Sequence, residues 1–439
     1  MRIKLMTGAA LALVLASPAF ASSSTVTQNT SSHTAVVDQT GSNASTSDIL
    51  QDGTENTATV TQSDGASAGP GSAHNTSEIT QNGILNSANV EQVNTGGASS
   101  PENASDITQT GDDATALVYQ EGSGNVSGID QTAGGAETAD VKQAGSGNTS
   151  LVNQYGDGGI VTVDQGFTGG ANDSSSDVQQ LGTDGTVTVL QSGETQTVIV
   201  TQDGVNSVAS TDQSGENNTA TVAQSGTDSV VTVIQIGSGV GNSVYIDQTG
   251  SNSTFDSNQD GSGNAIGAAA FLQSADDSDA TLDQFGFDNT ISGSQAGVNN
   301  SLNVEQIGEL QLASIDQSGT NNIMNVVQDL SGNEAMLTQG GNSNELGLSQ
   351  AGTTNGATIT QLGTDNLAEV EQLGTDNVVL INQTGNTGLI DVYQSALGAY
   401  AEVTQAGGSS NEAFVTQNSD FAVSIVSQNG SNNFASINQ

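Results

Sequence analysis

The most regularly spaced chemical group in this chain is the side-chain amide of glutamine. From Gln28 onward a glutamine recurs 36 times, and 27 of the 35 intervals between these glutamines are 11 residues long. An amide offers two donor hydrogens and one acceptor oxygen, so its chemistry is hydrogen bonding. The spacing therefore predicts a repeated hydrogen-bonding role along the chain.

Residues suited to catalysis or metal binding show no such order. His33 and His74 are the only histidines and there is no cysteine, which argues against a zinc site and favours surface positions for both. Gly-Thr-Asp triplets could offer oxygen ligands to Ca²⁺, but the nonapeptide pattern of calcium-binding β-rolls is missing, so turns explain them better. These triplets lie at 182–184, 226–228, 363–365 and 374–376. We expect no enzyme activity, catalytic residue, metal site or cofactor, because no nucleophile motif or single carboxylate pair stands out.

Apolar residues predict how the glutamines are oriented. Two residues before the glutamine the side chain is apolar in 33 of 36 cases, the exceptions being Thr211, Ser257 and Gly293. Acidic residues occupy the positions one or three before it. This alternation is typical of a β-strand. Because the glutamine shares the apolar parity, it should lie inside, where stacking identical amides satisfies their hydrogen bonds.

A turn follows each strand. Gly lies two residues after the glutamine in 26 of 35 intervals, often with Asn or Asp shortly afterwards. Both Gly and Asn tolerate positive φ. Each 11-residue unit is therefore predicted to be one short strand and one tight turn.

Two such units should form one coil. The five intervals of 13 or more residues follow Gln62, Gln92, Gln165, Gln235 and Gln259, which all end even-numbered strands. One corner of a two-strand coil is therefore expected to accept loops. The predicted fold is an all-β, amyloid-like β-solenoid of about 18 two-strand rungs with a 22-residue coil.

The N-terminus has the order of a secretory signal peptide. Arg2 and Lys4 precede an apolar run from Leu5 to Ala16, and the small-residue exit Ala19–Ala21 follows. We therefore assign 1–21 to a signal peptide and 22–439 to one repeat domain. No later stretch reaches the roughly 20 apolar residues of a membrane-spanning helix.

Charge restricts the partners of the exported chain. Loss of the two basic N-terminal residues changes the formal charge from −44 to about −46. Lys142 is then the only cation against 47 acidic residues. Nucleic acid is excluded as a partner, because its binding depends on cationic side chains.

Complete copies of the pattern Q-x-G-x-x-N-x-A-x-x-x-Q recur along the chain, and partial copies cover nearly all of 22–439. Five complete copies consist of Gln51, Gly53, Asn56, Ala58 and Gln62; Gln81, Gly83, Asn86, Ala88 and Gln92; Gln213, Gly215, Asn218, Ala220 and Gln224; Gln361, Gly363, Asn366, Ala368 and Gln372; and Gln428, Gly430, Asn433, Ala435 and Gln439. The pattern resembles the curlin repeat of bacterial curli subunits.

The resemblance implies a structural subunit of extracellular curli-like amyloid fibres, a pilus on the surface of a Gram-negative bacterium that serves cell adhesion and biofilm matrix formation. It also implies self-association and curli-type secretion and nucleation proteins as partners. The matched Gln and Asn residues would form polar ladders, and the matched Gly and Ala residues would form turns and tight packing. End rungs without caps are expected to add end to end. The alternative is a monomeric β-solenoid surface adhesin, with or without dependence on calcium.

Overall fold

The structure, a computed structural model, describes residues 11–15, 22–39, 44–64, 74–95, 100–132, 135–166 and 171–439. Over these residues the chain is all-β and forms a parallel β-solenoid of about 18 turns of roughly 22 residues, which confirms the predicted fold class. No helix in the described ranges is long and apolar enough to cross a membrane. Residues 1–10 and 16–21 of the expected signal peptide lie outside the described residues. Within it, β1 (Leu11–Leu15) pairs in parallel with β3 (Thr34–Asp38).

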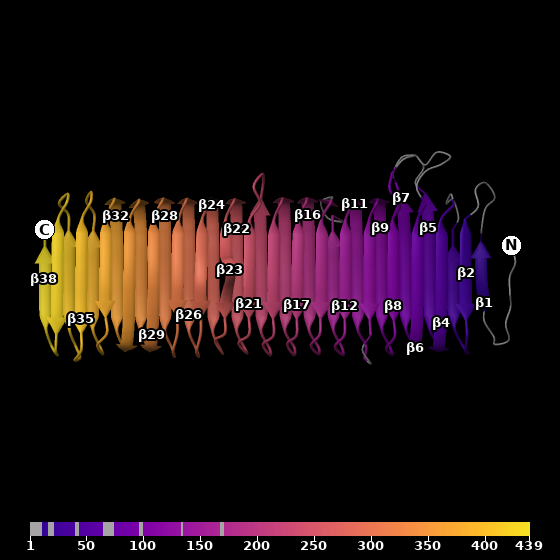
Figure 1. The fold of residues 1–439 in the computed structure, drawn as a ribbon, viewed down its shortest axis with the longest axis horizontal. Coiled ribbons are helices and arrows are strands. Elements are labelled where there is room, and N and C mark those ends of the chain that lie inside the picture. Colours follow the sequence, from indigo (N-terminus) through magenta and orange to yellow (C-terminus); the bar gives the residue numbers. More distant parts are fainter. Residues whose placement is uncertain are drawn as a thin grey trace. The chain divides into compact units, whose positions relative to one another are not determined.

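The chain divides into two compact units, Met1–Asn217 and Asn218–Gln439, and each contains strands of two parallel sheets, called sheet A and sheet B (Figure 1). In the first unit, sheet A contains β1, β3, β5 (Thr57–Asp64), β7 (Ser87–Asn94), β9 (Thr115–Ser123), β11 (Thr138–Ser146), β13 (Ile160–Gln165), β14 (Ala171–Asn172), β16 (Thr186–Glu194) and β18 (Val208–Glu216). Sheet B there contains β2 (Ser23–Gln28), β4 (Thr46–Thr54), β6 (Thr76–Ile84), β8 (Ala104–Gln109), β10 (Val126–Gln131), β12 (Thr149–Gln154), β15 (Ser175–Gln180) and β17 (Thr197–Gln202).

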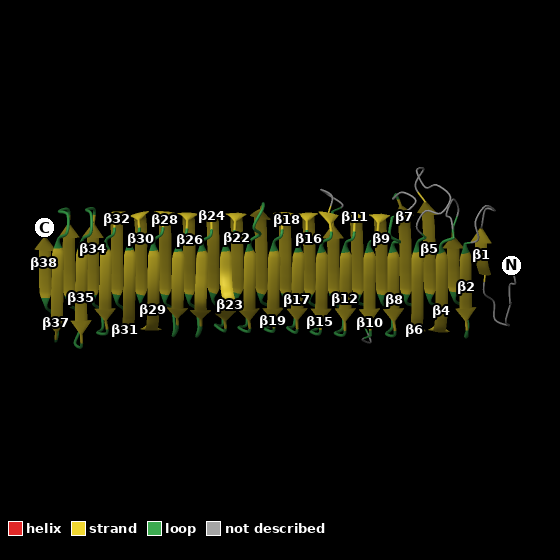
Figure 2. Ribbon diagram, turned by 45° about the horizontal axis from the view of Figure 1, so that its top comes forward, coloured by secondary structure: helices red, strands yellow, loops and turns green. Residues whose placement is uncertain are grey.

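The second unit continues the alternation. Its sheet A contains β20 (Val230–Gly237), β22 (Thr254–Ser262), β24 (Asp279–Phe287), β26 (Ser301–Glu309), β28 (Ile323–Ser331), β30 (Glu345–Thr353), β32 (Leu367–Thr375), β34 (Leu389–Gln394), β36 (Glu412–Gln417) and β38 (Phe434–Asn438). Its sheet B contains β19 (Thr219–Gln224), β21 (Ser243–Gln248), β23 (Ala265–Gln273), β25 (Thr290–Gln295), β27 (Leu312–Gln317), β29 (Glu334–Asn342), β31 (Gly356–Thr364), β33 (Val378–Gln383), β35 (Tyr400–Ala406) and β37 (Val423–Asn429). Figure 2 shows strands joined by short loops in both units.

The pairing register follows the 22-residue repeat. In sheet A of the second unit Leu346 pairs with Ala368, and in sheet B Ala335 pairs with Ala357. Along each strand burial alternates, as in β32, where Ala368, Val370 and the glutamine are buried and the residues between them are exposed or half-buried. The core therefore lies between the two sheets, and the predicted strand parity is confirmed.

Two positions adopt positive φ in many of the turns. The glycine two residues after the glutamine is one, as at Gly363, where φ is 120° and an added Cβ would lie 2.0 Å from the carbonyl oxygen of Gly385. The residue four after the glutamine is the other, as at Asp365 and Leu310, with φ of 54° and 55°. This second position follows from the structure alone, because its residue types vary widely.

The expectation that all long intervals add residues at one corner is wrong for the interval after Gln259. The three extra residues lie inside β23, where pairing with β21 is regular up to Ile266 and resumes at Phe271. This bulge keeps the side chains of Ile266 and Phe271 in the core. The Phe271 ring packs against Phe255 with the ring centroids 5.5 Å apart. Gly293 follows one rung later, where a Cβ would lie 1.9 Å from a backbone oxygen.

Leu310 provides a test of the turn. Its side chain is 63% exposed and its φ is positive, a conformation that asparagine adopts at lower cost than leucine. We expect Leu310→Asn to stabilise the neighbouring rungs by about 0.5–1 kcal/mol, seen as slower amide hydrogen exchange. Asn321→Leu, at the equivalent position of the next turn with φ of 55°, should have the opposite effect. Equal effects of the two substitutions would refute this account of the turn.

Candidate functional site: stacked amide ladders

The glutamines form one continuous ladder per sheet within each unit. In every step the Nε2 group of one glutamine donates to Oε1 of the glutamine one rung later. In sheet A of the second unit the ladder runs from Gln235 to Gln417 with N–O distances of 2.7–2.9 Å. Its sheet B ladder runs from Gln224 to Gln428 at 2.8–3.0 Å. The direction of donation is the same in all of these steps, so each ladder has a donor end and an acceptor end.

The second hydrogen of most of these amides connects the two sheets. Gln306 of β26 donates to the carbonyl of Thr290, the first residue of β25, at 3.1 Å. Gln317 of β27 donates in the same way to the carbonyl of Ser301 in β26 at 2.9 Å. These buried amides are thereby satisfied, as buried polar groups require, and each such glutamine links its own sheet to the start of the preceding strand.

Asparagines form a second ladder at the corners, five residues after the glutamine. Asn344 donates to the carbonyl oxygens of Gly340 and Gly363, at 2.8 and 3.0 Å. Its Oδ1 accepts the backbone N–H of Asn366 one rung later at 3.0 Å. The asparagine therefore satisfies carbonyls of two turns and one N–H group.

The residues singled out in the five complete motifs occupy equivalent places. In each copy the first glutamine ends the inward row of one strand, the glycine has positive φ, the asparagine lies in the turn, and the alanine begins the next inward row. The strands concerned are β4 and β5, β6 and β7, β18 and β19, β31 and β32, and β37 and β38. Gln439 departs from this arrangement, because Gln417 donates to Ser424 Oγ at 3.0 Å and Gln439 instead donates to the carbonyl of Val423 at 3.3 Å.

Several corner residues act in place of asparagine, and the motif search missed them. His33, expected at the surface, is 3% exposed because it lies five residues after Gln28. Its Nδ1 accepts the N–H of Asn56 at 3.3 Å, and burial lowers the pKa of its imidazole. Gln311 at the same position donates to two carbonyls. The spacing from the glutamine, rather than residue identity, would have identified these residues.

Glu137 also occupies this corner position, and it fits poorly. Its side chain is fully buried, Oε1 accepts the N–H of Gly135 at 3.3 Å, and Oε2 meets no donor among the described residues. Burial raises the pKa of this carboxyl, and Asp157 raises it further, against the lowering effect of backbone hydrogen bonds. The folded chain therefore keeps a proton on this carboxyl to a higher pH than the unfolded chain does.

Acidic residues lie on the outward faces of the sheets and repel one another. In the second unit Asp283 pairs with Glu305 across the sheet. Burial raises the pKa of Asp283, and the nearby carboxylates of Glu305 and Asp256 raise it further. Lys142 forms an ion pair with Asp140 at 2.7 Å. Because the pKa of Asp283 is raised in the folded chain, protonation of this carboxylate favours the folded state.

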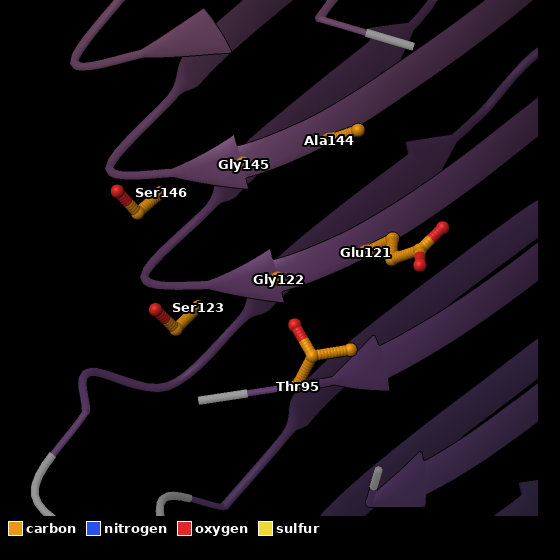
Figure 3. Close-up of a pocket in the computed structure, with 7 residues that line it drawn as sticks. All are labelled: Thr95, Glu121, Gly122, Ser123, Ala144, Gly145 and Ser146. Atoms are coloured by element: carbon orange, nitrogen blue, oxygen red, sulfur yellow. The ribbon is translucent and has the colours of Figure 1, made fainter. Parts of the chain in front are cut away.

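One surface pocket and the metal-ligating residue types bear on the expectations from the sequence. A shallow pocket of about 470 Å³ lies at a corner of the first unit, and its one carboxylate is that of Glu121 (Figure 3). The lining residues are Thr95, Glu121, Gly122, Ser123, Ala144, Gly145 and Ser146. Over the described ranges, no group of three or more His, Cys, Asp and Glu side chains is placed to hold a metal ion.

Removing one amide should break a ladder at two points. Gln328→Leu would leave Nε2 of Gln306 without its acceptor and Oε1 of Gln350 without its donor. Since each buried unsatisfied group costs about 1–3 kcal/mol, we expect a loss of about 2–5 kcal/mol in local stability, measured by hydrogen exchange. Gln179→Leu, at an exposed outward position, serves as control and should change stability little. Equal effects of the two would contradict a role for the ladder.

The buried carboxyl of Glu137 should make stability depend on pH. Because its folded pKa lies above the ordinary value of 4.5, its contribution is complete below that value and is lost as pH rises through the folded pKa. Glu137→Gln should therefore stabilise the first unit at pH 7 and leave it nearly unchanged at pH 4. Denaturant unfolding at the two pH values measures this, and an equal effect at both would exclude a titrating carboxyl.

The ladders and turns agree with a comparison to known families. The family model of the curlin associated repeat matches residues 136–166, 204–237, 275–308, 331–363 and 363–395. No curated protein matches the chain. Each matched segment contains a glutamine of the ladder together with the turn that follows it. With these repeats and the two-strand solenoid fold, the chain belongs to the curlin-repeat family.

Proposed function

We propose that the chain is a structural subunit of extracellular curli-like amyloid fibres, forming a pilus that serves cell adhesion and biofilm matrix formation. The curlin repeats and the solenoid fold fit a structural protein of this kind. Removal of the expected signal peptide, which contains β1, would leave β2 and β3 as the first rung. Growth would then occur by stacking the terminal rung of one copy on the opposite terminal rung of the next. The observation that carries the proposal is the match between these two rungs.

The rung of β2 and β3 and the rung of β37 and β38 present nearly the same inward side chains. In sheet B, Ser, Val and Gln occur in the same order in both, and in sheet A the only difference is Val against Ile. The inward residues are Ser24, Val26, Gln28, Ala35, Val37 and Gln39 in one rung and Ser424, Val426, Gln428, Ala435, Ile437 and Gln439 in the other. Stacking of these rungs would continue each column of inward side chains with a side chain of the same or nearly the same volume.

Hydrogen bonding gives the contact a direction. Gln28 Nε2 donates to Gln51 at 2.6 Å, while no described residue donates to Gln28 Oε1. At the other rung Gln428 Oε1 accepts from Gln405 at 2.8 Å, and its Nε2 donates only to the carbonyl of Glu412. Placing β2 of one copy on β37 of another would continue the ladder from Gln428 to Gln28. If the β37 ends of two copies met instead, the Nε2 donor of Gln428 in one copy would face the same donor in the other.

Charge affects the rate of this contact rather than its geometry. In the stacked arrangement no acidic residue would face another across the junction, and Asp38 would face Asn438. The formal charge of −44 still repels two copies at longer range, within the Debye length of about 8 Å at physiological salt. Assembly should therefore be faster at low pH or high salt.

Secretion and nucleation proteins of the curli type are the further partners that family membership supports, together with a cell-surface location. The alternative, a monomeric solenoid adhesin, shares the fold and differs in leaving the end rungs unpaired. Purification of residues 22–439 from denaturant, followed by thioflavin fluorescence and electron microscopy, separates the two. Fibres with a meridional spacing of about 4.7–4.8 Å support the subunit, and a stable monomer at high concentration and high salt supports the adhesin.

A charge inside the terminal rung should block stacking. Val426, which is 6% exposed, would face Val26 of the next copy, so Val426→Asp should slow fibre growth by about tenfold or more, because an unpaired buried charge is costly. Ser427→Asp adds the same charge to the outward face of the same strand and should slow growth far less. Circular dichroism checks that both variants keep their β-structure. Equal growth rates of the two variants would refute end-to-end stacking.

A further inference from the structure

The cores of the two units differ in side-chain size. Among the residues that the structure describes, every buried Leu, Met and Phe lies in the second unit, whereas the core of the first unit contains mainly Ala, Val, Ile and Ser. The large side chains are Phe255, Phe271, Leu282, Leu302, Met324, Leu337, Leu346 and Leu348. Burial of apolar area is the main stabilising term in folding. Each rung of the second unit therefore gains more stabilising free energy from its core than a rung of the first unit.

Polar atoms buried without a partner show the reverse distribution. Among the described residues, the first unit contains ten such residues and the second contains two. Those of the first unit are Ser47, Asn75, Ser127, Asp130, Glu137, Ser150, Ser176, Asp177, Gln196 and Thr211, and those of the second are Ser257 and Asn258. The serines form an inward column of sheet B, where the second unit has mainly Ala, Val and Ile. Unsatisfied buried groups lower stability, so this difference adds to that in core size.

One of the two corner ladders also differs between the units. In the second unit asparagines occupy consecutive rungs at this corner from Asn300 to Asn366, and Asn322, Asn344 and Asn366 each donate the backbone N–H to the preceding Oδ1. In the first unit the same corner carries Ala114, Glu137 and Gly159 in consecutive rungs. At this corner the asparagine hydrogen bonds between rungs are therefore continuous from Asn300 to Asn366 and interrupted from Ala114 to Gly159, whereas the other corner of the first unit keeps its asparagines from Asn103 to Asn148.

We propose that Asp279–Gln394, the segment from β24 to β34, is the intrinsic nucleus of ordering, and that the first unit orders after it. In a solenoid, stability is close to a sum of rung and nearest-neighbour terms, so ordering starts where these terms are most favourable. The glutamine spacing in this segment is 11 residues without interruption, which keeps loop closure short. The proposal rests on the proposed function, because it identifies the segment that starts fibre formation.

Pulsed hydrogen exchange of the mature chain, residues 22–439, during assembly from denaturant tests this order. Peptides from Asp279–Gln394 should become protected first, and peptides from Thr46–Glu216 should follow with a measurable delay. Simultaneous protection, or earlier protection of the first unit, would overturn the inference. Failure to form fibres under any condition would instead overturn the proposed function, so the two failures are distinguishable.

A matched pair of substitutions gives a second readout. Val379 and Val198 are both fully buried four residues before a sheet B glutamine, one inside the proposed nucleus and one outside it. Val379→Ser should lengthen the lag of thioflavin fluorescence by about threefold or more, and Val198→Ser by less than about twofold, because only the former weakens the nucleus. A longer lag for Val198→Ser than for Val379→Ser would refute the assignment, even if both variants still form fibres.

Discussion

The structure depends on the requirement that a buried side-chain amide must be hydrogen-bonded. A glutamine inside a narrow two-sheet core has no water to bind, and the group that satisfies it is the same amide one rung later. Gln306, for example, is placed between Gln284 and Gln328 and also binds the carbonyl of Thr290. This arrangement requires an equal inward row in every rung. It therefore explains why the inward row and the register vary so little while outward residues vary freely.

The turns must deliver each strand to the same register, and they do so with backbone conformations that few residues adopt cheaply. Gly363 and Asp365 have positive φ within one turn, and the corner asparagine bonds the carbonyls that these conformations leave open. Insertions are accepted where they leave the inward rows intact. The bulge in β23 does so within a strand, because Ile266 and Phe271 both stay in the core.

Most of the architecture could be predicted from the sequence, since a period of two and a repeat of 22 residues express the packing directly. The two-sheet solenoid and the inward glutamines required no more than this. The role of His33 could not be recognised from its residue type, because only its distance from Gln28 shows that it takes the place of an asparagine. The bulge after Gln259 could not be predicted either, because an interval three residues longer than usual has the same length whether the extra residues form a corner loop or a strand bulge. The signal peptide stays a prediction.

The most direct test of the account is hydrogen exchange of the glutamine side-chain amides in assembled protein, observed by solid-state NMR with labelled glutamine. The account predicts that the Nε2 hydrogens exchange as slowly as the backbone N–H groups of the same strands, because both are buried and bonded to the next rung. Gln179, which is exposed, should exchange rapidly and serves as an internal reference. Rapid exchange of all glutamine side chains, with the backbone protected, would contradict the amide ladders as the basis of the fold.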